Sequence, residues 1–233
     1  MIKKHPISKN SLLIAVLGVL SVTPVVLHAN TSTNYVGVDA VYSFMGFKTN
    51  YGANMFAKRA PGLNAFYGHK FNHIFGAEVG YEAEAKRSRV AVVYVNDYAA
   101  GVQVEGVRHE AYITKLYQKH PYVGVSASTA IKENNTLSML IGGSLSHIRA
   151  IYNQYADSAG ATDLTRTFAK TKLIPMVRVS AEHHFNDQFG LRALCTWRNT
   201  SQFKIKTQEN PLADSEVKLK NAINVGLGLT YNW

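Results

Sequence analysis

The sequence predicts an all-β protein, a transmembrane antiparallel up-and-down β-barrel of eight strands that is preceded by a cleaved signal peptide. Ten strands are the alternative. Three observations predict this fold: a strict alternation of apolar and polar residues at the C-terminus, an N-terminal export signal, and connections that alternate between short turns and long loops.

The C-terminal residues 217–233 carry the clearest alternation. Successive side chains of a strand point to opposite faces. One face would be wholly apolar and is made of Val217, Leu219, Ile223, Val225, Leu227, Leu229, Tyr231 and Trp233. The other face holds lysines, asparagines, glycines and a threonine, which is too polar and too small for half of a sandwich core. Lipid outside and a polar lumen inside fit this pattern best.

The N-terminus has the features of an export signal. Lys3, Lys4 and Lys9 precede an apolar run at residues 12–20. Polar residues and Pro24 interrupt this run before it reaches the roughly 20 residues that a transmembrane helix needs. We therefore expect a signal peptide at residues 1–29, with an uncleaved anchor as the alternative, and a barrel domain at residues 30–233. No later run is long enough for a membrane helix, so a chain of this kind would enter a bilayer as a closed barrel.

Seven further strands are expected from alternation between apolar and polar residues. They cover residues 36–44, 63–71, 77–85, 122–131, 137–146, 173–185 and 191–198. Short turns are expected at residues 72–73, 133–135 and 186–188, and long loops at residues 48–62, 87–121, 153–165 and 200–216. Short turns on the periplasmic side and long loops on the cell surface are typical of outer-membrane barrels.

Residues 87–121 leave the strand count open. Residues 90–95 and 102–107 suggest a hairpin around Asn96, Asp97 and Gly101. We interpret the region as a long surface loop or as strand ends that project above the bilayer. A ten-strand barrel is less favoured, because residues 90–95 fall short of the nine to eleven residues of a tilted spanning strand.

Charged residues fall on the inward parity of several predicted strands. Such charges would be costly in a dry core but can pair with one another in a narrow lumen. The expected lumen network consists of Asp39, Lys70, Glu78, Glu82, Glu84, Arg178, Glu182, Arg192, Arg198, Lys218 and Lys220. Because an eight-strand barrel is only wide enough for its own side chains, we expect a polar plug rather than a pore. A gated ion pathway is the alternative.

Composition narrows the classes of partner and cofactor. The formal net charge is +10, and it falls to +7 without the three lysines of the predicted signal. In an exported chain this excess favours lipopolysaccharide over nucleic acid as the anionic partner. Cys195 is the only cysteine, so an intramolecular disulfide is excluded and no cysteine-rich metal site can form. We expect no cofactor and no metal.

Three segments together resemble the small outer-membrane barrel families typified by the OmpA transmembrane domain, OmpX and the opacity-type surface proteins. They are residues 61–81 (PGLNAFYGHKFNHIFGAEVGY), residues 181–192 (AEHHFNDQFGLR) and the terminal GLGLTYNW. The resemblance covers the mature chain. It implies an integral protein of the Gram-negative outer membrane, with Leu229, Tyr231 and Trp233 as a signal for the barrel assembly machinery.

The function expected from these observations is structural or surface-interacting, in membrane integrity, adhesion or contact with a host or matrix surface. The surface-loop candidates are Tyr51, Phe56, Lys58, Arg59 and Tyr98. No catalytic residue is expected. A lipid A-modifying enzyme is an alternative because Ser144, Ser146 and His147 lie close together in sequence. However, Ser146 and His147 would point to opposite faces of the strand and could not act together as nucleophile and base. His183 and His184 would diverge in the same way, which argues against a metal site.

Overall fold

The structure is a computed structural model that describes residues 33–49, 56–99, 102–156, 164–206 and 216–233. The predicted signal peptide lies outside these residues. The elements are β1 (Thr33–Thr49), β2 (Arg59–Lys70), β3 (Phe75–Ala99), β4 (Val102–Lys132), β5 (Asn135–Ala156), β6 (Leu164–His184), β7 (Phe189–Arg198), the 3-10 helix η1 (Thr200–Gln202), β8 (Lys204–Lys206) and β9 (Glu216–Asn232).

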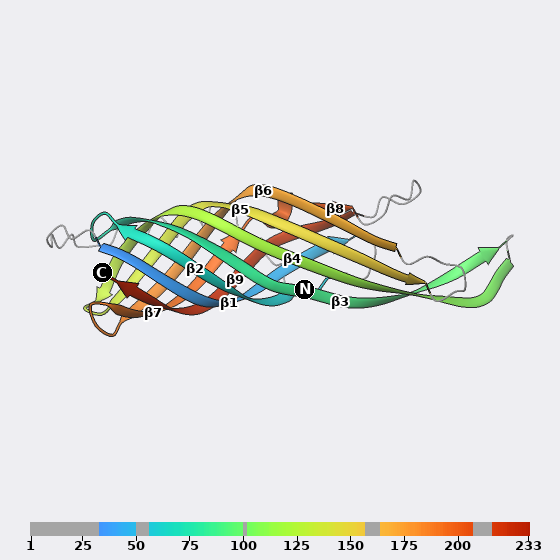
Figure 1. Ribbon diagram of the computed structural model, residues 1–233, viewed down its shortest axis with the longest axis horizontal. Coiled ribbons are helices and arrows are strands. Elements are labelled where there is room, and N and C mark those ends of the chain that lie inside the picture. Colours follow the sequence, from blue (N-terminus) through green and yellow to red (C-terminus); the bar gives the residue numbers. More distant parts are fainter. Residues whose placement is uncertain (1–32, 50–55, 100–101, 157–163, 207–215) are drawn as a thin grey trace, which may run out of the picture. The chain divides into compact units, whose positions relative to one another are not determined.

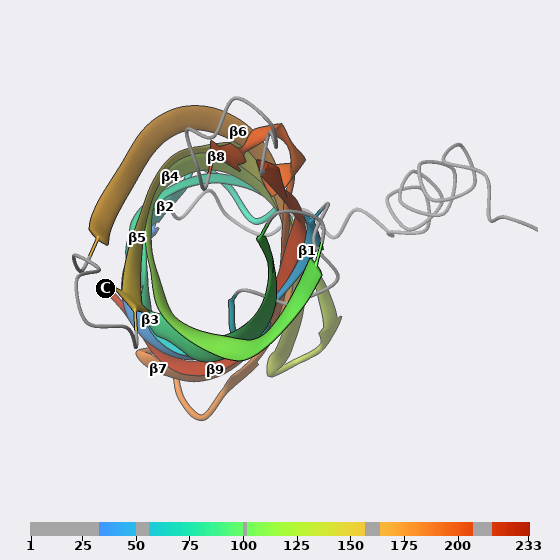
Figure 2. The same ribbon diagram turned by 90° about the vertical axis from the view of Figure 1, so that its right-hand side faces the viewer.

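Eight of the strands form a closed antiparallel ring (Figures 1 and 2). Each strand from β1 to β6 pairs with the next, β7 pairs with β9, and β9 pairs with β1 from Tyr35↔Asn232 to Thr49↔Val217. The short β8 pairs with the same edge of β9 as β7 does, beyond the end of β7. The predicted eight-strand up-and-down barrel is therefore confirmed.

At one end of the barrel the strands are connected by short turns. Two of these turns have the same local sequence pattern. Phe-Asn-x-x-Phe occurs at residues 71–75 and 185–189. In the first, the side chain of Asn72 accepts hydrogen bonds from the backbone N–H groups of residues 74 and 75, at 2.8 and 2.7 Å. In the second, Asn186 does the same for residues 188 and 189, at 2.9 and 2.7 Å. Asparagine favours such turns because its side chain can replace a backbone acceptor.

The outer face of the ring is apolar, as the alternation predicts. Val38, Leu63, Val125 and Leu227 are between 55 and 66 % exposed although they lie in regular strands. Apolar side chains exposed all round a closed ring require hydrocarbon as their surroundings. The barrel therefore spans a membrane. Among the described residues, no helix has both the length and the hydropathy needed to cross a bilayer.

At the other end of the barrel the strands extend beyond their predicted limits. The prediction of a surface loop at residues 87–121 is wrong, because β3 and β4 continue as a paired hairpin to Ala99↔Val102. The other interpretation, strand ends that project beyond the bilayer, is correct, and the hairpin extends past the rest of the barrel in Figure 1. The other long loops are also shorter than predicted, because β1, β2, β5, β6 and β8 extend into them.

A β-bulge in β9 reverses the predicted orientation of its first residues. The pairs Met45↔Ala222 and Phe47↔Leu219 leave two β9 residues, Lys220 and Asn221, opposite a single β1 residue. An extra residue in one strand shifts the alternation of faces by one. The sequence-based placement of Lys218 and Lys220 in the lumen is therefore wrong, since both are exposed. Val217 and Leu219, predicted to face lipid, are each 2 % exposed.

The reversed residues belong to an apolar cluster inside the barrel, on the side of the long connections. We call it the upper apolar cluster. It consists of Met45, Phe47, Phe56, Leu116, Ile148, Ala150, Ile174, Phe203, Val217, Leu219 and Ala222. Phe56 was a surface-loop candidate, and this prediction is also wrong, because its side chain is fully buried with its ring centroid 5.4 Å from that of Phe47.

Candidate functional site

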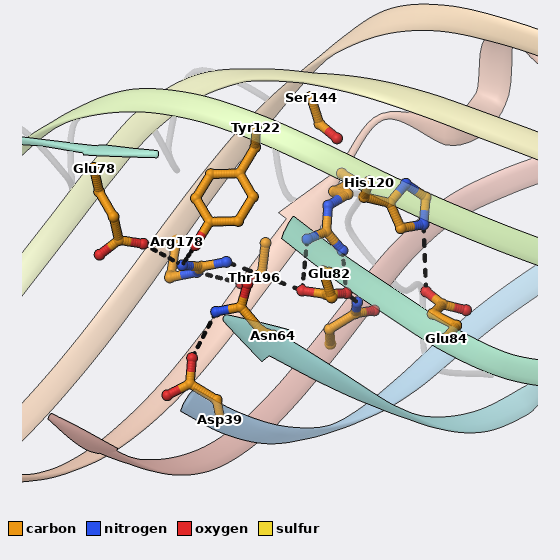
Figure 3. Close-up of polar contacts among 12 residues, drawn as sticks. Asp39, Asn64, Glu78, Glu82, Glu84, His120, Tyr122, Ser144, Arg178 and Thr196 are labelled. Atoms are coloured by element: carbon orange, nitrogen blue, oxygen red, sulfur yellow. Dashed lines mark hydrogen bonds and ion pairs between the residues drawn. The ribbon is translucent and has the colours of Figure 1, made fainter. Parts of the chain in front are cut away.

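The lumen below the upper apolar cluster contains a network of buried ion pairs (Figure 3). Nearest the short turns, Arg192 binds two acids: its Nη2 lies 2.6 Å from Asp39 Oδ2 and its Nη1 lies 2.9 Å from Glu78 Oε2. Asn64 donates a hydrogen bond of 2.7 Å to the same Asp39 oxygen. The Arg192 guanidinium also lies 3.5 Å from the ring centroid of Phe66, so an aromatic face covers the charge.

Glu78 links this first group to a second arginine. Arg178 Nη1 lies 2.7 Å from Glu78 Oε1, and the Tyr122 hydroxyl donates to the same oxygen at 2.7 Å. The Arg178 Nε group donates to Thr196 at 2.9 Å. Figure 3 shows Glu78, Tyr122 and Arg178 converging from different strands. Glu78 therefore binds Arg178 and Arg192 together.

Glu82 and Arg198 form a bidentate pair at the next level of the lumen. The two guanidinium nitrogens lie 2.7 Å from the two carboxylate oxygens, and neither residue is exposed. The side-chain amide of Asn224 donates to Glu82 Oε1. A parallel pair of charge-assisted hydrogen bonds is the strongest geometry open to these groups.

Below the upper apolar cluster, Glu84 lies between two basic side chains. Arg87 Nη2 donates to Glu84 Oε2 at 2.5 Å and to Ser43 at 2.6 Å. His120 Nε2 lies 3.6 Å from Glu84 Oε1, and His120 Nδ1 lies 2.8 Å from the Ser146 hydroxyl. Serine, histidine and glutamate thus stand in a row at the top of the polar lumen.

The network is balanced in charge. Asp39, Glu78, Glu82 and Glu84 supply four carboxylates. Arg87, Arg178, Arg192 and Arg198 supply four guanidinium groups that pair with them. A buried charge is tolerated only when an opposite charge and hydrogen bonds compensate its loss of water. The arrangement can hold the strands together and fill the lumen.

The other predicted lumen residues lie outside this network. Lys70 is the last residue of β2, at the short-turn end, and its Nζ lies 5.6 Å from the ring centroid of Tyr35. Glu182 accepts a hydrogen bond from Thr230, and its Oε2 lies 4.0 Å from His184 Nε2.

The remaining predicted site residues lie on the surface or outside the described residues. Lys58 and Arg59 are exposed, and Arg59 lies 5.8 Å from the Phe44 ring centroid. Tyr51 and the side chain of Tyr98 lie outside the described residues. Leu229, Tyr231 and Trp233 all face outward, and Tyr231 stacks on Trp233 with centroids 5.9 Å apart.

Sequence reasoning missed Arg87 and His120. His120 could have been found, because it shares the inward parity of Tyr122, Gly124 and Ser126, continued upstream through Pro121. Arg87 gave no such signal. It faces inward only because a register shift between Glu84 and Arg87 reverses the parity of β3.

The geometry also bears on the catalytic and metal alternatives. Ser146 is buried in the lumen, whereas His147 lies on the outer face and contacts Thr171 at 2.8 Å, so the two point apart as expected. Within the part of the chain that the structure describes, no three His, Cys, Asp or Glu side chains are grouped as metal ligands.

Gly80 is required for the position of Tyr122. A β-carbon at residue 80 would overlap the Tyr122 ring and hydroxyl. We expect Gly80→Ala to displace Tyr122 from Glu78 and Arg178 and to lower stability by about 1–3 kcal/mol, the usual cost of overpacking. Urea unfolding of the refolded barrel measures the loss in free energy of unfolding. Gly143→Ala is the control, because its β-carbon would meet only the end of the Leu173 side chain. Equal stability of the two variants would contradict the assignment.

Comparisons with known proteins match solved structures of outer-membrane proteins. No protein-family model and no curated protein sequence matches the chain. Ail of Yersinia pestis, solved with the heparin analogue sucrose octasulfate, is 16 % identical with a TM-score of 0.44, over 87 % of this chain and 99 % of that chain. The outer membrane protein OprG of Pseudomonas aeruginosa is 8 % identical with a TM-score of 0.48, over 88 % and 97 %. The outer membrane protease OmpT of Escherichia coli is 11 % identical with a TM-score of 0.49, over 89 % and 99 %.

The fold itself follows from the strand pairing and the distribution of side chains. The ring closes between β1 and β9, its outer face is apolar, and its inner face holds paired charges. Short turns lie at one end and long strand extensions at the other. The chain therefore has the fold of the small integral β-barrel proteins of the bacterial outer membrane.

Proposed function

We propose that this protein is an outer-membrane barrel with a structural and surface-interaction role, in which the projecting strands and connections contact lipopolysaccharide and a host or matrix surface. The observation that carries this proposal is the filled lumen. The ion-pair network lies toward the short turns, the upper apolar cluster lies toward the long connections, and the side chains of both are almost fully buried. Such a barrel presents its outer rim, rather than a passage, to its surroundings.

The filled lumen also favours this role over a narrow channel. Arg178, Arg198 and Phe203 are at most 1 % exposed, and each projects into the lumen from the barrel wall or its upper edge. We expect no single-channel conductance above the baseline from the refolded protein in planar bilayers. Discrete conductance steps recorded with the wild-type protein would support a narrow channel instead.

Adhesion through the rim is tested at the exposed cations of residues 58–60. Replacing these residues with Gly-Ser-Gly in the intact protein on cells should reduce adherence to a host-cell or matrix surface, because Lys58 and Arg59 are exposed at the start of β2. Lys132→Gln, an exposed charge at the opposite end, is the control. Adherence that stays at the wild-type level, with equal surface expression, would remove this segment from the account.

A second candidate function, hydrolysis of a lipid ester, is favoured by the row of Ser146, His120 and Glu84. A serine hydroxyl within hydrogen-bond reach of a histidine that faces a carboxylate is the arrangement of a nucleophile, its base and an orienting acid. Here Ser146 is fully buried, so a substrate would need to open the lumen. Mass spectrometry of lipid A from cells with wild-type protein or Ser146→Ala decides this, since identical acylation in both would exclude the enzyme.

The assembly signal remains part of the proposal. The outward Leu229, Tyr231 and Trp233 on the last strand are available to a lipid-embedded or membrane-bound assembly factor, because their side chains are not needed inside the barrel. This supports the barrel assembly machinery as a partner during insertion.

A further inference from the structure

Four lysines form a compact patch on the outer face of the barrel, which we call the lysine patch. Lys204 pairs with Lys218, and Lys218 pairs with Lys48, so three lysines stand in one row across β8, β9 and β1. Directly paired residues of neighbouring strands share a face, with β-carbons about 4.5–5.5 Å apart. Lys220 completes the patch, because its side chain lies over the position where Gly46 would carry a β-carbon.

The β9 bulge places two lysines of the patch, Lys218 and Lys220, on the outer face. Without the extra residue, Lys218 would share the inward parity of Asn224, as the uninterrupted alternation implies. With it, Val217 and Leu219 turn inward to the upper apolar cluster, and Lys218 and Lys220 turn outward. The same irregularity therefore builds an apolar interior and a basic exterior at one level of the barrel.

The lysine patch lies at the upper boundary of the lipid-facing surface. The outward residues of β1 are apolar from Val36 to Phe44, and the outward residues of β9 are apolar from Trp233 to Ile223. A strand of about nine to eleven residues spans the hydrocarbon, so this apolar surface accounts for one bilayer thickness. Beyond Phe44, the next residues on the outer face of β1 are Gly46 and Lys48. Beyond Ile223, the next exposed residues of β9 are Asn221 and Lys220. This is the level of lipid headgroups on the side of the long connections.

Like charges directly opposite one another destabilise a sheet. Among the side chains that the structure describes, which do not include that of Glu216, no carboxylate lies within ion-pair distance of Lys48, Lys218 or Lys220. Lys48, Lys218 and Lys220 are favourable side by side when an external anion neutralises them. Several ammonium groups at headgroup level match an amphiphile that carries more than one phosphate.

We propose that the lysine patch binds the phosphate groups of lipid A in the outer leaflet. The proposal rests on the proposed function, because it requires the barrel to sit in the outer membrane with its long connections outward. It adds the site, the ligand group and the role of the bulge.

The test compares thermal unfolding of the full mature barrel, refolded into phosphatidylcholine vesicles with and without bisphosphorylated lipid A. We expect lipid A to raise the Tm of the wild type by on the order of 5 °C. In the triple variant Lys48→Gln, Lys218→Gln, Lys220→Gln this rise should be lost. In phosphatidylcholine alone the variant should be at least as stable as the wild type, because removing like charges relieves repulsion.

Three controls make the outcome specific. The variant with arginine at all three positions should keep the response to lipid A, and Lys132→Gln at the opposite rim should not change it. Dephosphorylated lipid A should give no rise. An equal rise with lipid A in wild type and glutamine variant, or an equal rise with phosphatidylglycerol at the same charge, would overturn the proposal.

Failure of the proposed function would look different from failure of the patch. A protein that does not insert into vesicles, and so lacks the heat-dependent gel shift of a folded barrel, would contradict the outer-membrane role itself. Insertion without a lipid A-dependent rise in Tm would contradict only the lysine patch.

Discussion

Glu82→Ala is expected to lower the stability of the refolded barrel by about 3–5 kcal/mol, the usual cost of breaking one partner of a buried ion pair. The variant leaves the Arg198 guanidinium with no carboxylate, although its side chain is fully buried and both of its terminal nitrogens bind Glu82. It also removes the acceptor of the Asn224 amide. Urea titration in detergent or vesicles, followed by tryptophan fluorescence, measures the loss.

The double variant Glu82→Gln, Arg198→Met is the matched control. It removes both charges together and keeps an amide oxygen for Asn224, so its stability should lie much closer to that of the wild type. Arg178→Ala should also lower the stability, but by less than Glu82→Ala, because Glu78 keeps Arg192 as a partner. Unchanged unfolding in both single variants would remove the network as a source of stability.

Phe203→Ala is expected to cost about 3–5 kcal/mol, the range for deleting a buried aromatic side chain and leaving a cavity. Phe203 comes just after η1, is fully buried and packs in the upper apolar cluster. Its backbone oxygen also accepts a hydrogen bond of 3.0 Å from the backbone N–H of Leu219, which holds the residue before β8 against β9. The same unfolding measurement applies.

Two controls separate cavity formation from the loss of any phenylalanine. Phe203→Leu should cost less than about 1.5 kcal/mol because most of the volume is kept. Phe44→Ala removes a ring that is 38 % exposed on the lipid face, where lipid chains can fill the space. Equal losses for Phe203→Ala and Phe44→Ala would show that the upper apolar cluster is not a packed core.

The strand faces and short turns could be predicted from sequence because they depend on local chemistry. Alternation has a period of two, so the outward Val38 and the inward Asp39 follow directly from the pattern. Asn72 and Asn186 mark turns because their side chains bind the backbone within three residues. The inward acids of β3 also follow from this alternation, and their position on one face predicted a lumen in which charges pair.

The orientation beyond each bulge could not be predicted, because a bulge changes the parity without changing the composition. Lys218 and Leu219 alternate as regularly as Asn224 and Val225, yet they face the opposite way. The upper apolar cluster was missed for a related reason. Apolar side chains were assigned to lipid, whereas Phe56 and Phe203 lie outside the strands and fold inward.

The length of β3 and β4 could also not be predicted from the alternation of residues. Residues 90–95 do not alternate, and only their partners across the hairpin, such as Val90↔Ile113, identify them as strand. Such pairing is a non-local property. The sequence therefore indicated a hairpin but not that it continues the barrel strands.

The central claim is that side chains alternate between lipid and a sealed lumen around a closed ring, and the single cysteine allows a direct test. Cys195 faces outward between Val179 and Val225, whereas Thr196 is fully buried in the lumen. A fluorophore on Cys195 should be quenched by lipids that carry a spin label in the acyl chain. In the variant Cys195→Ala, Thr196→Cys, the thiol should resist labelling until the barrel is unfolded. Equal labelling and equal quenching at the two positions would contradict the account.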